Sequence, residues 1–346
     1  MSTSVVPQAV ERAIERAVEF LSRRQLPSGQ FPVENTLRDR ATGTLAIQTD
    51  NSPFATAHIV YSLGYTTQPE CRAMIARALD FLRSEQQGPG VWRHWSKASP
   101  KHAFIPPDAD DTACISHLFA RHGQAPDNVR LLLFNREASG LFYTWFIPRA
   151  KFGGTLRYWQ FLLGDLNAGR AFGFWKRTSA RRDDVDCVVN ANVLLYLGER
   201  PETRAVVDYL LRILDSGAEA TCDKWYHDPS VFWYAVSRAY AAGVVSLGDG
   251  QEVILRRIAE RERPTAENDL RTALHACSFL NFRQQNPALE SAIEYLVSAQ
   301  QHDGGWASSP FYGGPAMASV WGSRELTTGF CVEALSRYEV PGSQRA

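Results

Sequence analysis

The sequence lacks several features that mark common classes of protein. Its 37 Lys and Arg balance 37 Asp and Glu, and it contains no polybasic run. Nucleic acid is therefore not expected as its main ligand. No apolar run reaches the length of a membrane span, and the N-terminal segment carries charges throughout its helical pattern, which argues against a secretory signal. We expect a cytoplasmic protein.

Cysteine is scarce, and strand-like alternation is nearly absent. The six cysteines form no CxxC pair and no dense disulfide pattern, so we interpret them as mostly small buried apolar residues in a reducing compartment. Aromatic residues, in contrast, make up 11% of the chain and include nine Trp. This content requires either a large core or an apolar ligand.

An internal repeat is the strongest pattern in the chain. Residues 17–31, 78–92 and 292–306 share the form A-x-[ED]-[FY]-L-x3-Q-x3-G-x-[FW]. The first half has the apolar spacing of an amphipathic helix, and the G-x-aromatic half is typical of a turn. Each copy is therefore predicted to be a helix whose C-terminal turn folds an aromatic residue back onto it.

The helices that we expect fall into two alternating kinds. Charged amphipathic helices are predicted near 8–24, 70–86, 126–136, 201–215, 250–262 and 287–300. More apolar helices are predicted to begin near residues 52, 111, 186, 230, 269 and 326. A helix that is apolar on all sides requires burial, whereas a charged amphipathic helix suits an outer position. Six inner and six outer helices predict an all-α fold, a closed (α/α)6 barrel in one domain over residues 1–346.

One segment departs from this rhythm. Residues near 137–180 are rich in aromatics, Gly and Arg, which predicts a lid or an excursion over one mouth of the barrel. An irregular apolar excursion that only packs against the barrel would explain the same composition.

These features resemble a known group of enzymes. The Q-x3-G-x-W turn is similar to the QW repeat of squalene-hopene and other triterpene cyclases, and DADDTA at residues 108–113 resembles the DxDDTA motif of class II terpene cyclases. The resemblance implies an enzyme of isomerase or lyase type that cyclises an isoprenoid after protonating it. Class II cyclases generally join two helical barrels, whereas this chain has residues for one. A homodimer and the 137–180 excursion are rival replacements for the second barrel.

The chain also resembles the protein prenyltransferase β subunit, which is a single (α/α)6 barrel. That family binds zinc through a D-x-C pair and a distant His. Here the segment DVDC places Asp184 three residues before Cys187, so the zinc spacing fails and no metal site is predicted.

Three crowded carboxylates carry the predicted chemistry. Carboxyl groups a few ångströms apart cannot all ionise, so crowding raises the pKa of at least one and keeps it protonated. By resemblance, Asp110 delivers the proton, and Asp108 and Asp111 are its hydrogen-bonding partners. Asp111 would equally serve as the N-cap of the helix that follows.

Aromatic side chains are candidates for guiding the resulting cation, because their ring faces attract positive charge without reacting. Each of them would equally suit the core. His227 and Tyr226 are of a type that could accept the final proton. The aromatic candidates for substrate contact are Phe54, Trp175, Trp225, Tyr226, Phe232 and Trp233.

A basic segment at residues 176–184 lies beside the predicted excursion. If the substrate is a prenyl diphosphate, we expect Arg181 and Arg182 to hold the anion. A solvated loop with internal ion pairs is the alternative. No cofactor is required, although Mg²⁺ would assist by bridging phosphate oxygens of a diphosphate. A lipophilic substrate would also bring the protein into peripheral contact with a membrane.

The sequence therefore predicts a class II terpene cyclase-like enzyme that acts on a polyprenyl substrate. A non-catalytic or isoprenoid-binding (α/α)6 barrel stays open as an alternative, as does a prenyltransferase-like protein without the zinc site.

Overall fold

The computed structural model describes residues 7–38, 45–149, 156, 159–160, 163–164, 172–261, 269–314 and 319–338. Over these residues the protein is mostly helical, with one small sheet. In the described part of the chain, no helix is long and apolar enough to cross a membrane. The predicted excursion at 137–180 lies partly outside the described residues, which include 137–149 and 172–180 of it.

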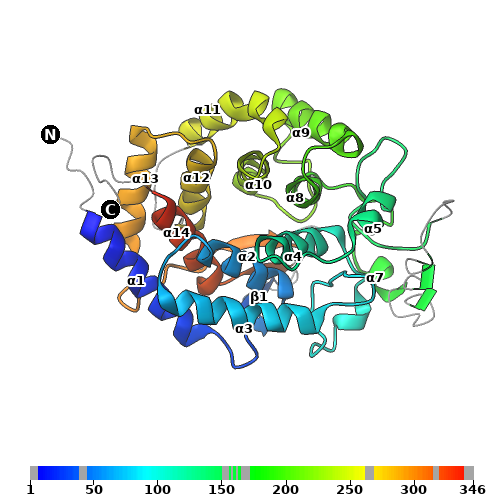
Figure 1. Ribbon diagram of the computed structural model, residues 1–346, viewed down its shortest axis with the longest axis horizontal. Coiled ribbons are helices and arrows are strands. Elements are labelled where there is room, and N and C mark those ends of the chain that lie inside the picture. The colour runs from blue at the N-terminus through cyan, green and yellow to red at the C-terminus, as the bar shows by residue number, and fades with distance from the viewer. Residues whose placement is uncertain are drawn as a thin grey trace.

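Six helices form a continuous inner ring (Figure 1). Each packs against the next in chain order, and the last packs against the first. These helices are apolar on all sides because they are surrounded by other elements, and in α2 (Pro53–Leu63) every residue is buried. They are α2 (Pro53–Leu63), α4 (Ala109–Arg121), α8 (Cys187–Leu197), α10 (Pro229–Ala241), α12 (Asp269–Asn281) and α14 (Arg324–Arg337).

More charged helices lie outside this ring (Figure 1). α1 shows the principle, since Val10, Ala17 and Leu21 lie on one buried face while its charged residues lie on the other. All the positions predicted for the two kinds of helix are occupied by helices. The outer ones are α1 (Pro7–Arg24), α3 (Pro69–Glu85), α5 (Val129–Phe134), α9 (Arg204–Ser216), α11 (Gln251–Arg261) and α13 (Pro287–Ala299). The described part of the chain also contains the short helices η1 (His102–Phe104), α7 (Phe172–Arg177), η2 (Pro201–Thr203) and η3 (Val245–Gly250).

The repeated turns fasten outer helices to the inner ring. Phe31, Trp92 and Trp306 each donate a backbone N–H to a threonine on an inner helix, at 3.0, 3.2 and 3.2 Å respectively. Gln25 closes its own turn by donating to the carbonyl of Gly29 at 2.8 Å and also reaches the neighbouring helix α3. The repeat is therefore architectural, as expected.

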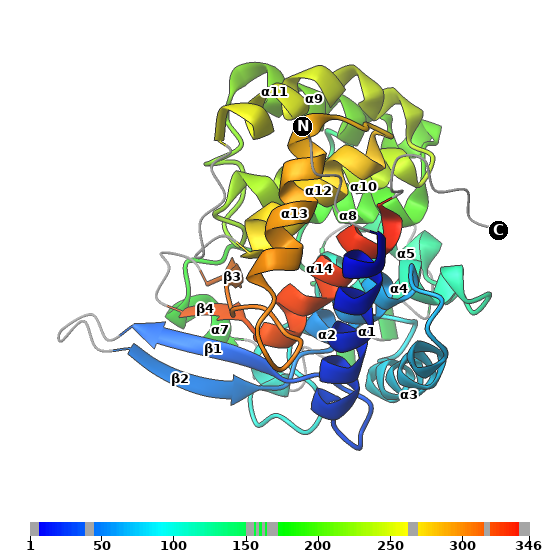
Figure 2. The same cartoon turned by 90° about the vertical axis from the view of Figure 1, so that its left-hand side faces the viewer.

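A four-stranded antiparallel sheet was not predicted. Its order is β2-β1-β4-β3, with β1 (Val33–Arg38), β2 (Leu45–Asp50), β3 (Pro310–Gly313) and β4 (Ser319–Gly322). Figure 2 shows it beside the helices, with the β1–β2 pair reaching outward. β1 joins β4 across most of the chain, in a register that pairs Asn35 with Trp321. The strands escaped prediction because they are short and β2 is largely exposed, so no alternation marks them.

The cysteines only partly follow the expectation. Four of them, Cys71, Cys114, Cys277 and Cys331, are free and buried. Cys187 and Cys222, however, form a disulfide between the start of α8 and the loop after α9. Their separation of 35 residues hid this pairing, since only the fold brings the two Cα atoms to 5.8 Å.

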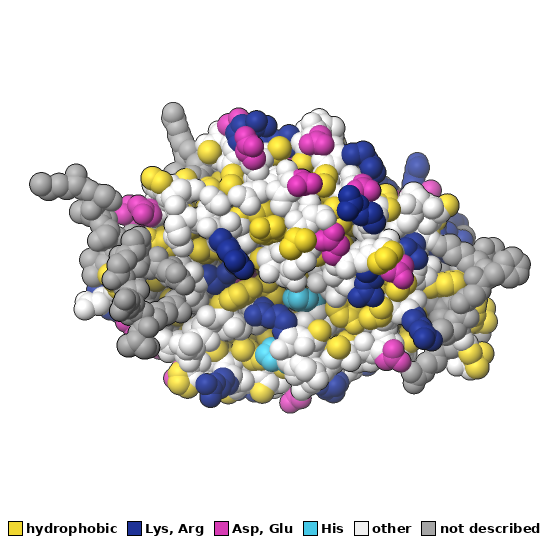
Figure 3. All heavy atoms as spheres, turned by 45° about the horizontal axis from the view of Figure 1, so that its top comes forward, with side chains coloured by type: hydrophobic (Ala, Val, Ile, Leu, Met, Phe, Trp, Pro, Cys, Tyr) yellow, Lys and Arg dark blue, Asp and Glu magenta, His cyan; other side chains and the backbone are white. Residues whose placement is uncertain are grey.

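Basic and acidic side chains are interspersed with apolar ones on the face drawn in Figure 3.

Candidate active site

The DADD segment forms the entry into the inner helix α4. The side chain of Asp108 accepts a hydrogen bond from the backbone N–H of Asp111 at 2.7 Å, so Asp108 is the N-cap. The assignment of this role to Asp111 was wrong. Hydrogen bonds to two other segments also hold the backbone in place. The backbone N–H of Asp108 donates to the carbonyl of Trp92, and the N–H of Ala109 donates to the carbonyl of Thr144.

Asp110 differs from its two neighbours in exposure and in partners. Asp108 and Asp111 are 6% and 3% exposed, whereas Asp110 is partly accessible. Tyr226 donates its hydroxyl to Oδ2 of Asp110 at 2.5 Å, and Asn192 donates its amide to Oδ1 at 2.7 Å. The hydrogen bonds to this carboxyl group thus come from Tyr226 and Asn192, not from Asp108 and Asp111 as expected. Capping commits Asp108 to the helix backbone instead.

Burial raises the pKa of all three carboxyls, and repulsion between aspartates adds to the rise at Asp108 and Asp111. Burial, together with the charge of Asp110, raises the pKa of Asp108 to about 7. Burial and the charge of Asp108 raise the pKa of Asp111 well above its ordinary value. Burial also raises the pKa of Asp110, but hydrogen bonds from Tyr226 and Asn192 and the charge of Arg238 oppose this rise. The pKa of Asp110 is therefore raised by burial, and these three groups limit the rise.

A cavity of about 700 Å³ opens at this segment. All three aspartates line it, and the sheet closes one side through residues of β1, β3 and β4. A cavity of this size lies in the usual range for small-molecule sites. Its aromatic wall consists of Phe54, Trp95, Phe104, Trp145, Phe174, Trp225, Tyr226, Tyr312 and Trp321.

Predicted substrate-contact residues divide between this wall and other places. Phe54, Trp225 and Tyr226 line the cavity. Phe232 and Trp233 do not, because α10 buries them at 1% and 3% exposure within the helical core. An inner helix is apolar on every side and only one face meets the cavity, so the contact of these two residues with substrate stays a prediction.

The remaining candidates lie beside the cavity. Trp175 packs edge-on against Trp145 and Phe174, two residues of the aromatic wall. Arg181 and Arg182 are exposed on the loop before α8 and do not line the cavity, so their role in anion binding stays a prediction. His227 lines a separate cavity of about 350 Å³.

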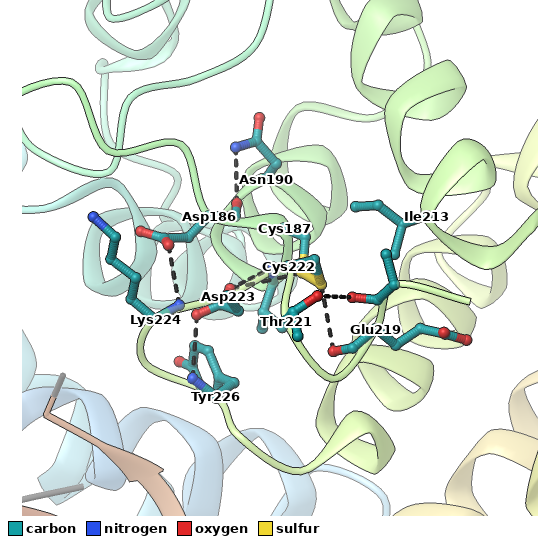
Figure 4. The surroundings of a disulfide bond; sticks show 12 residues. Asp186, Cys187, Asn190, Ile213, Glu219, Thr221, Cys222, Asp223, Lys224 and Tyr226 are labelled. Carbon is teal, nitrogen blue, oxygen red and sulfur yellow. Dashed lines mark hydrogen bonds between the residues drawn. A yellow bond between two sulfur atoms is a disulfide. The ribbon is translucent and has the colours of Figure 1, made fainter. Parts of the chain in front are cut away.

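A second group of buried carboxylates holds the aromatic wall in place (Figure 4). Asp223 accepts hydrogen bonds from the backbone N–H groups of Trp225, Tyr226 and Val188, at 2.8, 3.1 and 2.9 Å. Asp186 accepts from the indole of Trp225 at 3.2 Å. The loop that carries Trp225 and Tyr226 is thus bound to α8, and the adjacent disulfide adds a covalent link.

This group explains the DVDC segment. Asp184 pairs with Lys224 and accepts from the indole of Trp145 at 3.5 Å, and Cys187 is bonded to sulfur rather than free as a thiolate. Within the described ranges, no group of three His, Cys, Asp or Glu side chains is placed to hold a metal ion. The segment thus positions aromatic side chains of the cavity wall.

The opposite wall carries a third polar group. Asp50 accepts hydrogen bonds from the indoles of Trp95 and Trp321, at 2.8 and 3.2 Å, and lies 3.7 Å from the ammonium of Lys101. Burial lowers the pKa of His94 to about 4, so its imidazole is neutral near pH 7. Both His94 and Lys101 line the cavity.

Sequence reasoning missed several of these residues. Asn192 was the most informative omission, since the two buried amides of the mostly apolar helix α8, Asn190 and Asn192, are themselves a signal. Trp145 lay in the segment noted only for its aromatic content. Tyr312 and Trp321 belong to strands that were not predicted.

Comparison with known proteins identifies solved structures with a similar fold. No protein-family model matches the sequence, and no curated protein matches it either. A solved protein from Actinoplanes shares 18% identity over 95% of this chain and 99% of its own, with a TM-score of 0.71.

Two further solved structures carry functional names. The type II terpene cyclase MstE from Scytonema, in complex with its substrate geranylgeranyl dihydroxybenzoate, shares 17% identity over 96% of this chain and 97% of its own, with a TM-score of 0.68. The ent-copalyl diphosphate synthase from Streptomyces platensis shares 17% identity over 87% of this chain and 53% of its own, with a TM-score of 0.58. At these identities the likeness shows a type II terpene cyclase fold.

Proposed function

We propose that the chain is a class II terpene cyclase-like enzyme built as a single (α/α)6 barrel domain, in which Asp110 starts the reaction by protonating an isoprenoid. One observation carries the proposal. The carboxyl of Asp110 is the accessible member of a buried aspartate group, and it borders a cavity whose wall is largely aromatic. The likeness to type II terpene cyclases supports it at the level of the fold.

The first step moves one proton. Asp110 transfers its carboxyl proton to a terminal alkene or epoxide of the substrate, which leaves a carboxylate on the protein and a cation on the substrate. Successive alkenes attack the cation and close one or more rings. Loss of a proton from a neighbouring carbon, or capture of water, ends the sequence. The hydrogen bonds from Tyr226 and Asn192 stabilise the carboxylate that the first step creates.

The aromatic wall stabilises the cation and keeps water away from it. Each ring face contributes about 0.5–2 kcal/mol to a nearby cation. Phe54, Trp225 and Tyr226 are the predicted contacts that border the cavity, and Trp145 and Tyr312 join them. The neutral imidazole of His94 is a candidate for the final proton acceptor, in addition to Tyr226 and His227.

Cavity size limits the substrate. A heavy atom takes roughly 30 Å³, the share of one water in the liquid, so chains of 15 to 20 carbons take roughly 450 to 600 Å³ and a chain of 30 carbons roughly 900 Å³. The cavity of about 700 Å³ therefore has room for the hydrocarbon part of a substrate with 15 to 20 chain carbons, not counting its head group. The head group would lie near Lys101, Thr178 and Ser179, which border the same cavity.

Two head groups fit this proposal. One is an aromatic acid of the kind carried by the MstE substrate, and the other is a diphosphate. A diphosphate would bring in Arg181 and Arg182 and would make Mg²⁺ helpful, whereas no cofactor is needed otherwise. We further propose a cytoplasmic enzyme that meets its lipophilic substrate at a membrane surface, acting alone or as a homodimer.

The test is direct incubation with candidate substrates. Geranyl, farnesyl and geranylgeranyl diphosphates, geranylgeranyl dihydroxybenzoate and squalene are each mixed with the wild type, with Asp110→Asn and with Asp80→Asn, an exposed control on α3. Products are identified by mass spectrometry, and binding is measured by calorimetry. We expect cyclic products from a chain of 15 to 20 carbons, undiminished in Asp80→Asn and absent in Asp110→Asn although binding persists.

Two outcomes would contradict this expectation. Cyclisation that survives Asp110→Asn would remove Asp110 from its role. Binding by the wild type without any product would favour the isoprenoid-binding barrel.

A further inference from the structure

A buried arginine stands behind the proposed proton donor. Arg238 of α10 is 3% exposed and donates from Nη2 to the amide oxygen of Asn192 at 2.6 Å. Asn192 in turn donates from its amide nitrogen to Oδ1 of Asp110 at 2.7 Å. Three inner helices, α10, α8 and α4, thus contribute one hydrogen-bonded chain that ends on the carboxyl.

Arg238 has no carboxylate of its own. In the part of the chain that the structure describes, no ion pair to this residue is found, and its Nε has no hydrogen-bond partner. The nearby carboxylate of Glu333 is already engaged, since Oε1 pairs with Arg337 at 3.0 Å and Oε2 accepts from Ser62 and Tyr234. The guanidinium instead lies over the rings of Tyr61 and Tyr234, at 5.1 and 5.0 Å from the centroids.

Burying a guanidinium without a carboxylate is costly, so the arrangement calls for an explanation. We propose, on the basis of the proposed function, that Arg238 is a positioning residue that supplies the countercharge for Asp110 through Asn192 once the proton has left. It does not touch the substrate, and it acts through the amide that links it to the acid.

The countercharge acts at the moment of proton transfer. Before transfer Asp110 is neutral and gains little from a nearby cation. After transfer it is a carboxylate, and the attraction to Arg238 is present in full. An interaction that grows along the reaction lowers the barrier without tightening substrate binding. Burial alone would keep the proton on Asp110 but make it a weak acid, and Arg238 offsets part of that penalty.

The size of the effect follows from distance. The two hydrogen bonds and the amide between them separate the charges by roughly 7 Å, and at an effective dielectric constant of about 20 this corresponds to between one and two pKa units. Other groups act on the same carboxyl or on Arg238 and must stay unchanged in a test. They are Asp108, Asp111, Cys114 and His117 of the α4 segment, Tyr226 and Asp223 of the loop, His58 and Tyr61 of α2, Tyr234 of α10, Tyr312 of β3 and Glu333 of α14.

The experiment measures the acid itself, without turnover. Infrared difference spectra against Asp110→Asn isolate the carboxyl band of Asp110, and its titration gives the pKa in the wild type, Arg238→Gln, Arg238→Lys and the control Arg257→Gln. Arg257 lies on the outer helix α11, where it pairs with Glu219 and donates to the carbonyl of Leu214, so it is not a member of this chain of hydrogen bonds. We expect a rise of about one to two pKa units in Arg238→Gln, a smaller rise in Arg238→Lys and no change in the control.

Kinetics provide the second readout. With a substrate that the wild type cyclises, Arg238→Gln should lower kcat at least tenfold and leave KM within twofold. The loss of activity at alkaline pH should also move to higher pH, because the acid stays protonated longer. A merely structural role would instead lower the melting temperature with no shift in the carboxyl titration.

The outcomes separate this inference from the proposed function. An unchanged Asp110 pKa in folded Arg238→Gln overturns it, whether or not any substrate is cyclised. If Arg238→Gln does not fold, an unchanged Asp110 pKa in Arg238→Lys overturns it instead, because the shorter side chain moves the charge away from Asn192. A raised pKa in a protein that cyclises nothing would uphold the countercharge and reject the cyclase.

Discussion

Removing one hydroxyl group from the site tests how far the partners of Asp110 control its acidity. Tyr226 donates to Oδ2 of Asp110, and its ring also packs edge-on against Phe311 and Tyr312. Tyr226→Phe deletes the donor and keeps the ring. The cavity wall should therefore persist, while the carboxylate formed by proton transfer loses one of its two hydrogen bonds.

The expected loss can be worked out from that single contact. A hydrogen bond to a charged group contributes about 1.5–3 kcal/mol, and each 1.36 kcal/mol of barrier is tenfold in rate, so kcat should fall by about 10- to 150-fold. KM should change little, because the contact strengthens only after the proton leaves. The hydrogen bond favours the ionised form, so its removal raises the pKa of Asp110. Activity that requires protonated Asp110 should then persist to higher pH.

The assay is steady-state cyclisation between pH 5 and 9, with the melting temperature measured on each variant. Tyr196→Phe is the matched control. Tyr196 lies on α8, the inner helix that also carries Asn192, and its hydroxyl donates to Asn128 at 2.8 Å and not to Asp110. A kcat within twofold of the wild type, or a loss confined to KM, would refute the reasoning.

Three further predictions concern the scaffold. Gly29 has a φ of 92°, and a Cβ there would lie 2.2 Å from the carbonyl oxygen of Arg77. Gly29→Ala should therefore lower the free energy of unfolding, measured in urea, by about 2 kcal/mol or more. Gly123→Ala, where a Cβ would meet open space, should lower it by about half as much. Reduction of the Cys187–Cys222 bond, which closes a loop of 35 residues, should lower the free energy of unfolding by up to about 4 kcal/mol; equal stability with and without reductant would contradict this. Burial raises the pKa of Asp186 from 3.8 to about 6, so between these pH values the folded chain holds a proton that the unfolded chain releases. The stability that this proton contributes is full below about pH 4 and is lost as the pH rises towards 6. Asp186→Asn should therefore show a flatter decline of unfolding free energy between pH 4 and 6 than the wild type, and parallel curves would count against the shift.

Local pattern was sufficient for the helices and for choosing a candidate acid. The apolar spacing of α1 and the apolar character of α2 on all sides are properties of neighbouring residues, so the sequence alone predicts them. Asp110 was found in the same way, from a short motif ahead of an apolar helix. The repeated turns also revealed their role, because Gln25 and Gly29 form their contacts within a few residues.

Long-range pairing was the main source of error. Tyr226 and Asn192 lie 116 and 82 residues from Asp110, and no local signal joins them to it. The strands β1 and β4 meet from opposite ends of the chain, and the disulfide joins two cysteines that looked isolated. The burial of Phe232 and Trp233 away from the cavity could not be foreseen for a related reason, since the composition of an inner helix does not tell which face meets the cavity.

The sequence by itself determined which segments are helices, which of them are buried, and where three carboxyls crowd together. Those properties depend on residues within one or two turns of each other. Only the tertiary structure decided that Asp108 caps the helix, that Asp110 faces the cavity, and that Tyr226 and Asn192 hold it. The acidity of a buried carboxyl depends on the charges and donors within a few ångströms, and the fold alone brings those groups together.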